Sequence, residues 1–246
     1  MSATLRSELR RVVATPIYWW LLLATAAIGV VGTLAPLIAT DSPAGMLTDR
    51  KLQEAMHGAA AGATLVIVAG IVGVEGDSRH GQASQVFLTT PRRSRVLAAK
   101  TVVYAFVGTL YGIAAAFGAT ATAWGWYRAN DQALPLERSA VWLTLLGCVA
   151  VATVFGVLGV ALGAITRNQV TGIVAALGWM VLVEPALFAA SPKLFRWLPG
   201  MASFSLRRQP TEGLLSVGPA SAVLLGIVAV ALWLGRRLVE RDDVTA

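Results

Sequence analysis

The polar groups most able to do chemistry lie together in one segment, residues 75–98, with the sequence EGDSRHGQASQVFLTTPRRSRVLA. Glu75 and Arg79 give its beginning both signs of charge. The stretch 83–88 is mixed in polarity and could form a short amphipathic helix, which Pro91 would end. An alternative is that the basic residues that follow are simply a positively charged anchor on the cytoplasmic side. Because such an anchor would not need the acidic and apolar residues before it, the segment favours a docking surface for another protein.

One acidic residue, Glu184, lies inside a long apolar stretch of the sequence. Counted from Val170 at 1.5 Å per residue, it lies about 21 Å along a helix, in the outer third of a hydrocarbon layer of about 30 Å. An ionisable group at that depth is functional by default, and the following Pro185 removes a backbone hydrogen bond and can break the helix. We interpret Glu184 and Pro185 as an external gate or as a contact for a cationic substrate. The alternative is a structural ion pair of Glu184 with Lys193 or Arg196.

The residues of common catalytic and metal centres are sparse in this chain. It has two histidines, His57 and His80, and one cysteine, Cys148, and it contains neither an H-E-x-x-H nor a G-x-S-x-G pattern. A phosphate-binding loop needs a lysine directly after a glycine, whereas the three lysines here follow arginine, alanine and proline. We therefore expect no catalytic residue, no metal site and no cofactor in this chain.

The composition indicates the kind of structure that must position these groups. Of 246 residues, 56% are hydrophobic and 13% are charged, with a mean hydropathy of +0.67. Soluble domains carry about 25% charged residues, and disordered chains need low hydrophobicity with high charge. The net charge of +7 is spread through the segments between apolar runs, which is typical of membrane topology rather than of nucleic-acid binding. The sequence thus predicts an all-α membrane protein with no nucleic-acid partner.

Apolar segments of the length that crosses a bilayer, about 20 residues, occur six times, and we expect one transmembrane domain over 1–246. With the N-terminus inside, the inner segments hold 12 Lys and Arg and the outer segments hold 8. This bias favours both termini in the cytoplasm. The predicted spans are 17–39, 54–74, 99–126, 140–165, 170–190 and 219–235.

Two further patterns concern how the helices pack. Apolar residues near the N-terminus, Leu5, Leu9, Val12 and Val13, recur on one face of a helix, which predicts an amphipathic helix in the headgroup plane before Pro16. Gly-xxx-Gly pairs inside the spans predict close helix packing. They do not indicate a specific dimer seam, because the glycine content alone predicts about two such pairs. The pairs are Gly58-xxx-Gly62, Gly108-xxx-Gly112 and Gly159-xxx-Gly163.

Several loose motifs occur in a fixed order along the chain. After the second span come Glu75-Gly76-x-x-Arg79-x-Gly81, Leu88-Thr89-Thr90-Pro91-x-x-Ser94-Arg95 and Lys100; later come Arg167-Asn168-Gln169, Glu184-Pro185, Leu198-Pro199-Gly200 and Gly235-Arg236-Arg237. In this order the chain resembles the ABC type-2 permease family, the six-span membrane subunits of ATP-driven exporters. The middle motifs look like the actinobacterial branch of that family.

This resemblance implies a mechanism without a nucleotide site in the chain itself. The N-terminal helix would be an elbow helix, and the segment 191–218 would form short re-entrant helices at the outer side. A cytoplasmic coupling helix within 75–95 would dock into a separate ABC ATPase, which would hold ATP and Mg. The complex would contain a second permease copy or a homologue, as a dimer in the bacterial plasma membrane. The residues that would couple to the ATPase are Glu75, Arg79, Gly81, Leu88, Pro91 and Arg95.

The expected function is export of a hydrophobic or amphiphilic compound, such as a drug, a lipid or a peptide. Two alternatives stay open, a secondary transporter or channel and a structural subunit of another membrane complex. Secondary transporters usually show internal repeats and ionisable groups at the membrane midplane, and the two halves of this chain show neither a repeat nor a midplane acid pair.

Overall fold

A computed structural model describes residues 2–39, 48–79 and 93–241 of the chain. The described residues form helices and contain no strand. The elements are α1 (Ser2–Ala14), α2 (Pro16–Ile38), α3 (Asp49–Met56), η2 (His57–Ala60), α4 (Thr64–Arg79), α6 (Arg93–Ala129), α7 (Ser139–Thr166), α8 (Gln169–Gly178), η3 (Trp179–Val183), α9 (Glu184–Ala190), α10 (Pro192–Phe195), α11 (Pro199–Leu206) and α12 (Val217–Arg241).

Six stretches of these helices are long and apolar enough to cross a membrane, as the sequence predicts. The second stretch consists of α3, η2 and α4 in series, and the fifth consists of α8, η3 and α9. The chain therefore has the all-α architecture of a multi-pass membrane protein. The six stretches are Pro16–Ile38, Asp49–Val74, Ser94–Ala129, Ser139–Thr166, Gln169–Ala190 and Val217–Glu240.

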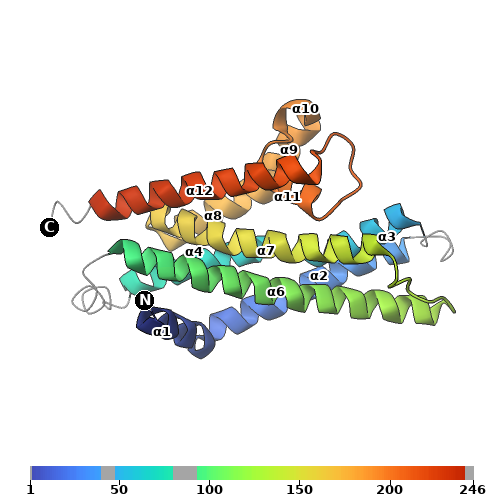
Figure 1. The fold of residues 1–246 in the computed structure, drawn as a ribbon, viewed down its shortest axis with the longest axis horizontal. Coiled ribbons are helices and arrows are strands. Elements are labelled where there is room, and N and C mark those ends of the chain that lie inside the picture. Colours follow the sequence, from blue (N-terminus) through green and yellow to red (C-terminus); the bar gives the residue numbers. More distant parts are fainter. Residues whose placement is uncertain (1, 40–47, 80–92, 242–246) are drawn as a thin grey trace.

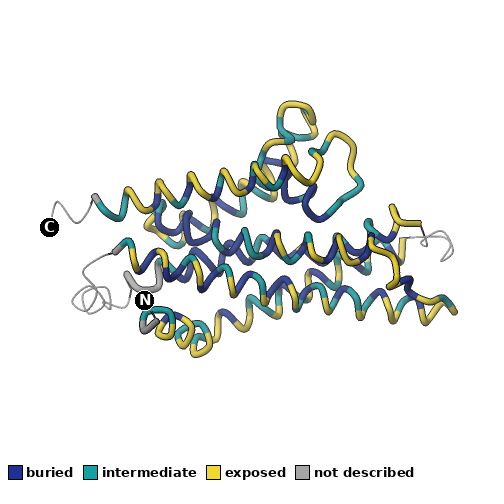
Figure 2. The backbone as a smooth tube through the Cα atoms, in the orientation of Figure 1, coloured by how far each residue is buried: buried dark blue, intermediate teal, exposed yellow. Residues whose placement is uncertain are grey.

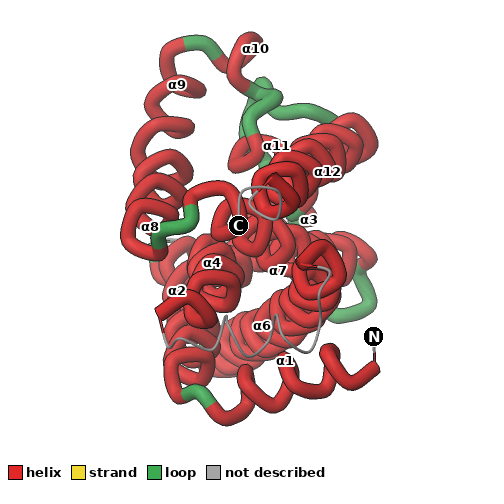
Figure 3. The backbone as a smooth tube through the Cα atoms, turned by 90° about the vertical axis from the view of Figure 1, so that its left-hand side faces the viewer, coloured by secondary structure: helices red, strands yellow, loops and turns green. Residues whose placement is uncertain are grey.

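The six membrane-length stretches run roughly along the long axis of the molecule (Figure 1), whereas α1 runs across that axis (Figure 3) and lies beside the start of α2 and the first half of α6. The end of α4, the start of α6 and the end of α12 share one end of the bundle with α1. We call this the inner end, following the predicted orientation, and the opposite end, with α3 and the start of α7, the outer end.

Helix α7 lies at the centre of the bundle, where it packs against α4, α6 and α12. The predicted Gly-xxx-Gly pairs all lie in close contacts within the chain. A Cβ on Gly62 would lie 2.5 Å from the carbonyl oxygen of Thr25, and one on Gly112 would lie 2.8 Å from the Cα of Val149. A Cβ on Gly163 would lie 3.2 Å from the Cα of Ile71. These glycines let the backbones of α2, α4, α6 and α7 approach, because no side chain separates them.

Many residues on the outer layer of the bundle are exposed (Figure 2), and large hydrophobic side chains are among them. Only 11% of the apolar window of the fifth stretch is buried, against 67% for the second. Leu182 and Leu225 are among the exposed side chains on α12 and the fifth stretch. Contiguous apolar surface of this extent marks contact with a membrane or with another protein.

Candidate functional site

The predicted coupling residues lie at the inner end, as far as the structure describes them. Glu75 and Arg79 belong to the last turns of α4, and Arg95 belongs to the first turn of α6 with an exposed side chain. Gly81, Leu88 and Pro91 lie outside the described residues. The coupling helix therefore stays a prediction, but the two helices that lead into and out of its segment end side by side in the bundle.

A buried ion pair lies directly behind this part of the inner end. Lys100 Nζ on α6 donates to Glu8 Oε2 on α1 at 3.0 Å and to the carbonyl oxygen of Gly73 on α4 at 2.7 Å. The two charged side chains are 4% and 11% exposed. Removing both charges from water is expensive unless the geometry is good and hydrogen bonds satisfy them, so this contact fixes α1, α4 and α6 to one another.

A tyrosine cluster extends the same contact to α2. The hydroxyl groups of Tyr18 and Tyr104 are 2.5 Å apart, and the Tyr111 hydroxyl donates to the carbonyl oxygen of Tyr18. All three tyrosines are buried. The ring of Tyr104 occupies the space in which Gly73 lacks a side chain. We call Glu8, Lys100, Gly73, Tyr18 and Tyr104 the inner node; it joins four helices.

Glu184 forms a second buried polar contact, toward the outer end. Glu184 is completely buried, with an exposed fraction of 0%. Trp179 Nε1 donates to Oε1 at 2.6 Å, and the backbone N–H groups of Gly200 and Met201 donate to Oε2 at 2.6 and 3.3 Å. The first amides of a helix lack intrahelical partners and carry partial positive charge, so the carboxylate caps α11. We call Glu184, Trp179, Gly200 and Met201 the outer node.

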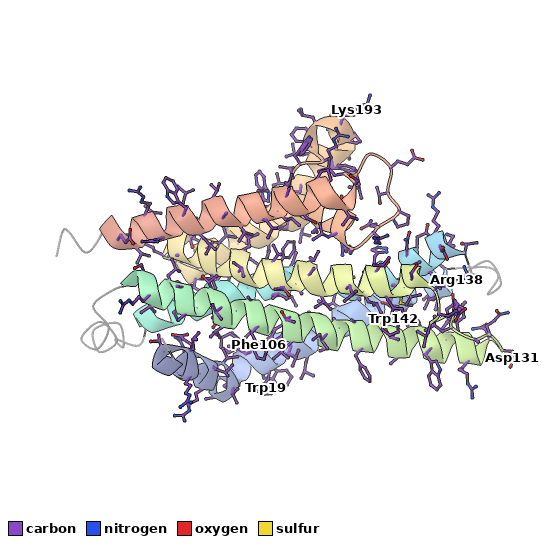
Figure 4. All side chains as sticks on the ribbon, viewed as in Figure 1. Trp19, Phe106, Asp131, Arg138, Trp142 and Lys193 are labelled. Carbon is purple, nitrogen blue, oxygen red and sulfur yellow. The ribbon has the colours of Figure 1, made fainter. Side chains whose placement is uncertain are left out.

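This arrangement differs from the ion pair with Lys193 or Arg196 that the sequence suggests, whereas the role of Glu184 as a gate or substrate contact stays a prediction. The carboxylate takes its three hydrogen bonds from N–H donors of α11 and Trp179, not from Lys193 or Arg196. Lys193 lies on α10, which projects away from the bundle (Figure 4). The carboxylate is thus already satisfied by hydrogen bonds within the chain.

Pro185 does not end the helix in the way the sequence suggests. The fifth stretch passes through the π-helical turn η3, in which the N–H of Glu184 bonds to the carbonyl oxygen of Trp179, and continues as α9. A π-turn inserts an extra residue into the helix and often marks a functional site. Here the π-turn directly precedes Glu184 and Pro185, and the helix continues beyond it as α9. The fifth stretch diverges from the bundle toward α10 (Figure 3).

Two cavities border the outer node. The larger, about 340 Å³, lies between α4, α7, α8 and α12 and has an apolar lining that includes Ile67, Leu158 and Ile227. The smaller, about 240 Å³, lies between η2, α4, α7, the fifth stretch and α11. Met180 borders both cavities. Small-molecule sites are typically concave and apolar with a few placed polar groups, and these cavities have that character.

Comparisons with models of known protein families and with curated proteins found no match. The geometry of the chain combines six membrane-length helical stretches, a buried inner node, a buried outer node and two cavities beside the outer node.

Proposed function

We propose that this protein is the transmembrane permease subunit of an ABC exporter, which forms the substrate pathway and is driven by a separate ATPase subunit. The observation that carries the proposal is the inner node. Lys100, Glu8 and Gly73 join α1 to the two helices, α4 and α6, between which the segment 75–95 runs. A force applied to that segment would move these helices together, because their relative positions are held by buried polar contacts.

The packing of α4 and α6 supports transmission of such a force into the bundle. Both helices pack along α7 through close glycine contacts, at Gly163 for α4 and at Gly112 for α6. Tightly packed interiors transmit displacement and switch between discrete arrangements instead of deforming gradually. ATP-driven closure of the ATPases would thereby shift the bundle between inward-open and outward-open states. The substrate would bias that equilibrium only by its different affinity for the two states.

The outer part of the pathway would be formed by α11 and the fifth stretch. The outer node holds α11 against Glu184 and Trp179. For the pathway to open toward the outside, these hydrogen bonds must break, or α11 and the fifth stretch must move together as one body. The apolar cavities beside it suit a hydrophobic or amphiphilic compound. Here α10 and α11 act as the re-entrant segment, and α1 acts as the elbow helix.

The proposal assigns partners to the surfaces of the chain. The segment 75–95 would dock on the ATPase, which holds ATP and Mg. The exposed apolar faces of α2 and the fifth stretch would contact lipid or a second permease copy or homologue in the bacterial plasma membrane. Both termini would be cytoplasmic.

The test uses the protein purified together with an ABC ATPase subunit and reconstituted in liposomes. We expect ATP-dependent export and stimulated ATP hydrolysis, and we expect Arg79→Glu, Leu88→Asp and Arg95→Glu each to lower ATP-driven transport at least tenfold with normal membrane insertion. Arg128→Glu is the matched control, because Arg128 is an exposed arginine at the opposite end of α6. Transport of solute by the protein alone would refute the proposal and favour a secondary transporter or channel. Unchanged coupling in all three variants would remove 75–95 from the mechanism.

A further inference from the structure

Arg207 is a buried cation in the outer half of the bundle. It follows α11 directly, and the residue is 8% exposed. A Cβ on Gly147 would lie 2.9 Å from the Cα of Arg207. Because Gly147 lies about 12 Å along α7 from Ser139, Arg207 lies beside a membrane span and not beyond its end. A guanidinium does not lose its proton in proteins, so a positive charge is held at this depth.

The structure gives this charge little compensation. The guanidinium carbon lies 4.2 Å from the centre of the Phe204 ring, which is a cation–π contact. Its Nε is buried and has no hydrogen-bond partner among the described residues. The ion pairs formed within the described ranges do not include Arg207, and Glu184 uses its carboxylate for the outer node. An unpaired charge away from water is expensive, and at membrane depth it marks a functional site.

Arg207 lines the cavity of about 240 Å³ together with both polar and apolar groups. The polar ones include Thr64 and Ser203, and the apolar ones include Phe155, Val181 and Phe204. The cavity therefore has one cationic position within mainly apolar walls. A small inorganic anion would use the charge but leave the apolar walls without contacts, whereas an apolar molecule would leave the charge unpaired.

We propose that this cavity binds the anionic head of a single-chain amphiphile, such as a carboxylate or a phosphate monoester, with Arg207 as the ion-pairing group. The first methylenes of the chain pack against Phe155 and Val181. The adjoining cavity of about 340 Å³, which shares the wall residue Met180, takes the remainder of the chain. The site belongs to this chain alone, and its occupancy does not depend on the proposed function, since binding requires neither ATP nor an ATPase.

The test uses the full-length protein in phosphatidylcholine nanodiscs and a dodecanoic acid that carries a photoreactive diazirine near its carboxylate. After illumination, mass spectrometry maps the labelled peptides. We expect labelling of peptides from η2, α4 and α11 that line the cavity, and we expect unlabelled dodecanoate to compete at least tenfold better than dodecanol. Equal competition by dodecanol would overturn the proposal, because it would show that the charge is not recognised.

The decisive variant is Arg207→Gln, with Arg208→Gln as the matched control. Arg208 is the neighbouring arginine and is not among the residues that line the cavity. We expect Arg207→Gln to lower labelling at least tenfold with an unchanged or higher thermal midpoint, since a buried unpaired charge is removed. Arg208→Gln should keep the labelling of the original protein. Equal labelling of both variants would overturn the proposal.

Two further arms cover folding and the source of the ligand. Thr64→Phe keeps Arg207 but fills the cavity, so this variant should also abolish labelling. If the Arg207→Gln protein fails to insert into the membrane, persistent labelling of the Thr64→Phe protein would overturn the proposal. Dodecyl phosphate and phosphatidylglycerol are compared as competitors. Stronger competition by dodecyl phosphate supports the single-chain ligand, whereas stronger competition by phosphatidylglycerol would overturn it and assign the anionic site to a two-chain lipid of the bilayer.

Discussion

Replacing Glu184 with glutamine tests whether the outer node holds α11 against the bundle. The carboxylate accepts hydrogen bonds on both oxygens, from Trp179 on Oε1 and from the N–H groups of Gly200 and Met201 on Oε2. A glutamine has one carbonyl oxygen and one NH₂ group. In Glu184→Gln one side of the contact therefore places a donor against a donor, and the capping charge at the N-terminus of α11 is lost.

The size of the effect follows from these contacts. A hydrogen bond to a charged group contributes about 1.5–3 kcal/mol, and a buried donor left without a partner costs about 1–3 kcal/mol. Because the glutamine keeps one of the two sides, we expect a net loss of about 2.8 kcal/mol, which is a factor of ~100 in the opening equilibrium of α11. Trp179→Phe removes one hydrogen bond to the carboxylate and should cost about 1.5–3 kcal/mol, or a factor of about 10 to 150.

Cys148 provides the assay. It is the one cysteine of the chain, it is 2% exposed, and it lies on α7 next to Gly147, on which the end of α11 packs. The thiol lies 3.8 Å from the carbonyl oxygens of Met56 and His57, so a maleimide can reach it only when α11 and η2 move apart around α7. Under rapid reclosing the labelling rate follows that open population. Glu184→Gln should therefore label ~100-fold faster, since that factor is the expected change in the opening equilibrium.

Glu212→Gln is the matched control, because Glu212 is an exposed acid of the same outer segment. A labelling rate for Glu184→Gln within about threefold of this control would refute the reasoning, since 0.7 kcal/mol or less would then separate the two variants. Transport measured on the same samples separates the two roles of Glu184. Retained transport in the loosened variant assigns it to structure, and lost transport with unchanged labelling assigns it to the gate.

Two further substitutions test the inner node and the close packing behind it. Lys100→Met leaves its buried carboxylate partner on α1 unpaired and should lower the free energy of unfolding by about 3–5 kcal/mol. The control Arg10→Met, at an exposed position of α1, should change it by less than about 0.5 kcal/mol. Thermal unfolding in detergent measures both variants, and equal midpoints would contradict the stabilising role of the inner node. Gly73→Ala forces a methyl group into the ring of Tyr104 and should destabilise by about 1–3 kcal/mol. Gly178→Ala, with no atom within 4 Å of the added Cβ, should be neutral or stabilise by up to about 1 kcal/mol, and the opposite order of these two variants would contradict the packing described for α4 and α6.

The spans follow from the sequence to within a few residues. The segment 140–165 corresponds to α7, Ser139–Thr166, and 17–39 corresponds to α2, Pro16–Ile38. A helix in hydrocarbon satisfies its backbone groups internally and must match the thickness of the layer. Both requirements are local, so length and apolarity are enough to find the helices. The apolar periodicity of residues 5–13 likewise predicts α1.

The partners of the polar groups do not follow from the sequence. The lysine at position 100 reads as part of a basic cluster, yet its partner is Glu8, 92 residues away. For Glu184 the nearby basic residues suggest an ion pair, yet α11 folds back so that its N-terminal amides reach the carboxylate first. The sequence does indicate that Lys100 needs a polar partner, because this lysine lies at the start of a long apolar run. It does not indicate which residue that partner is.

The sequence by itself determined that this chain forms six membrane-length helices and an amphipathic N-terminal helix, since these depend on local periodicity and on the thickness of a bilayer. Only the tertiary structure decided which buried charge is paired within the chain, namely Lys100 with Glu8, and which buried cation has no ion-pair partner among the described residues, namely Arg207. The physical reason is that compensation of a charge depends on atoms a few ångströms away, and helix packing brings these together from distant parts of the sequence.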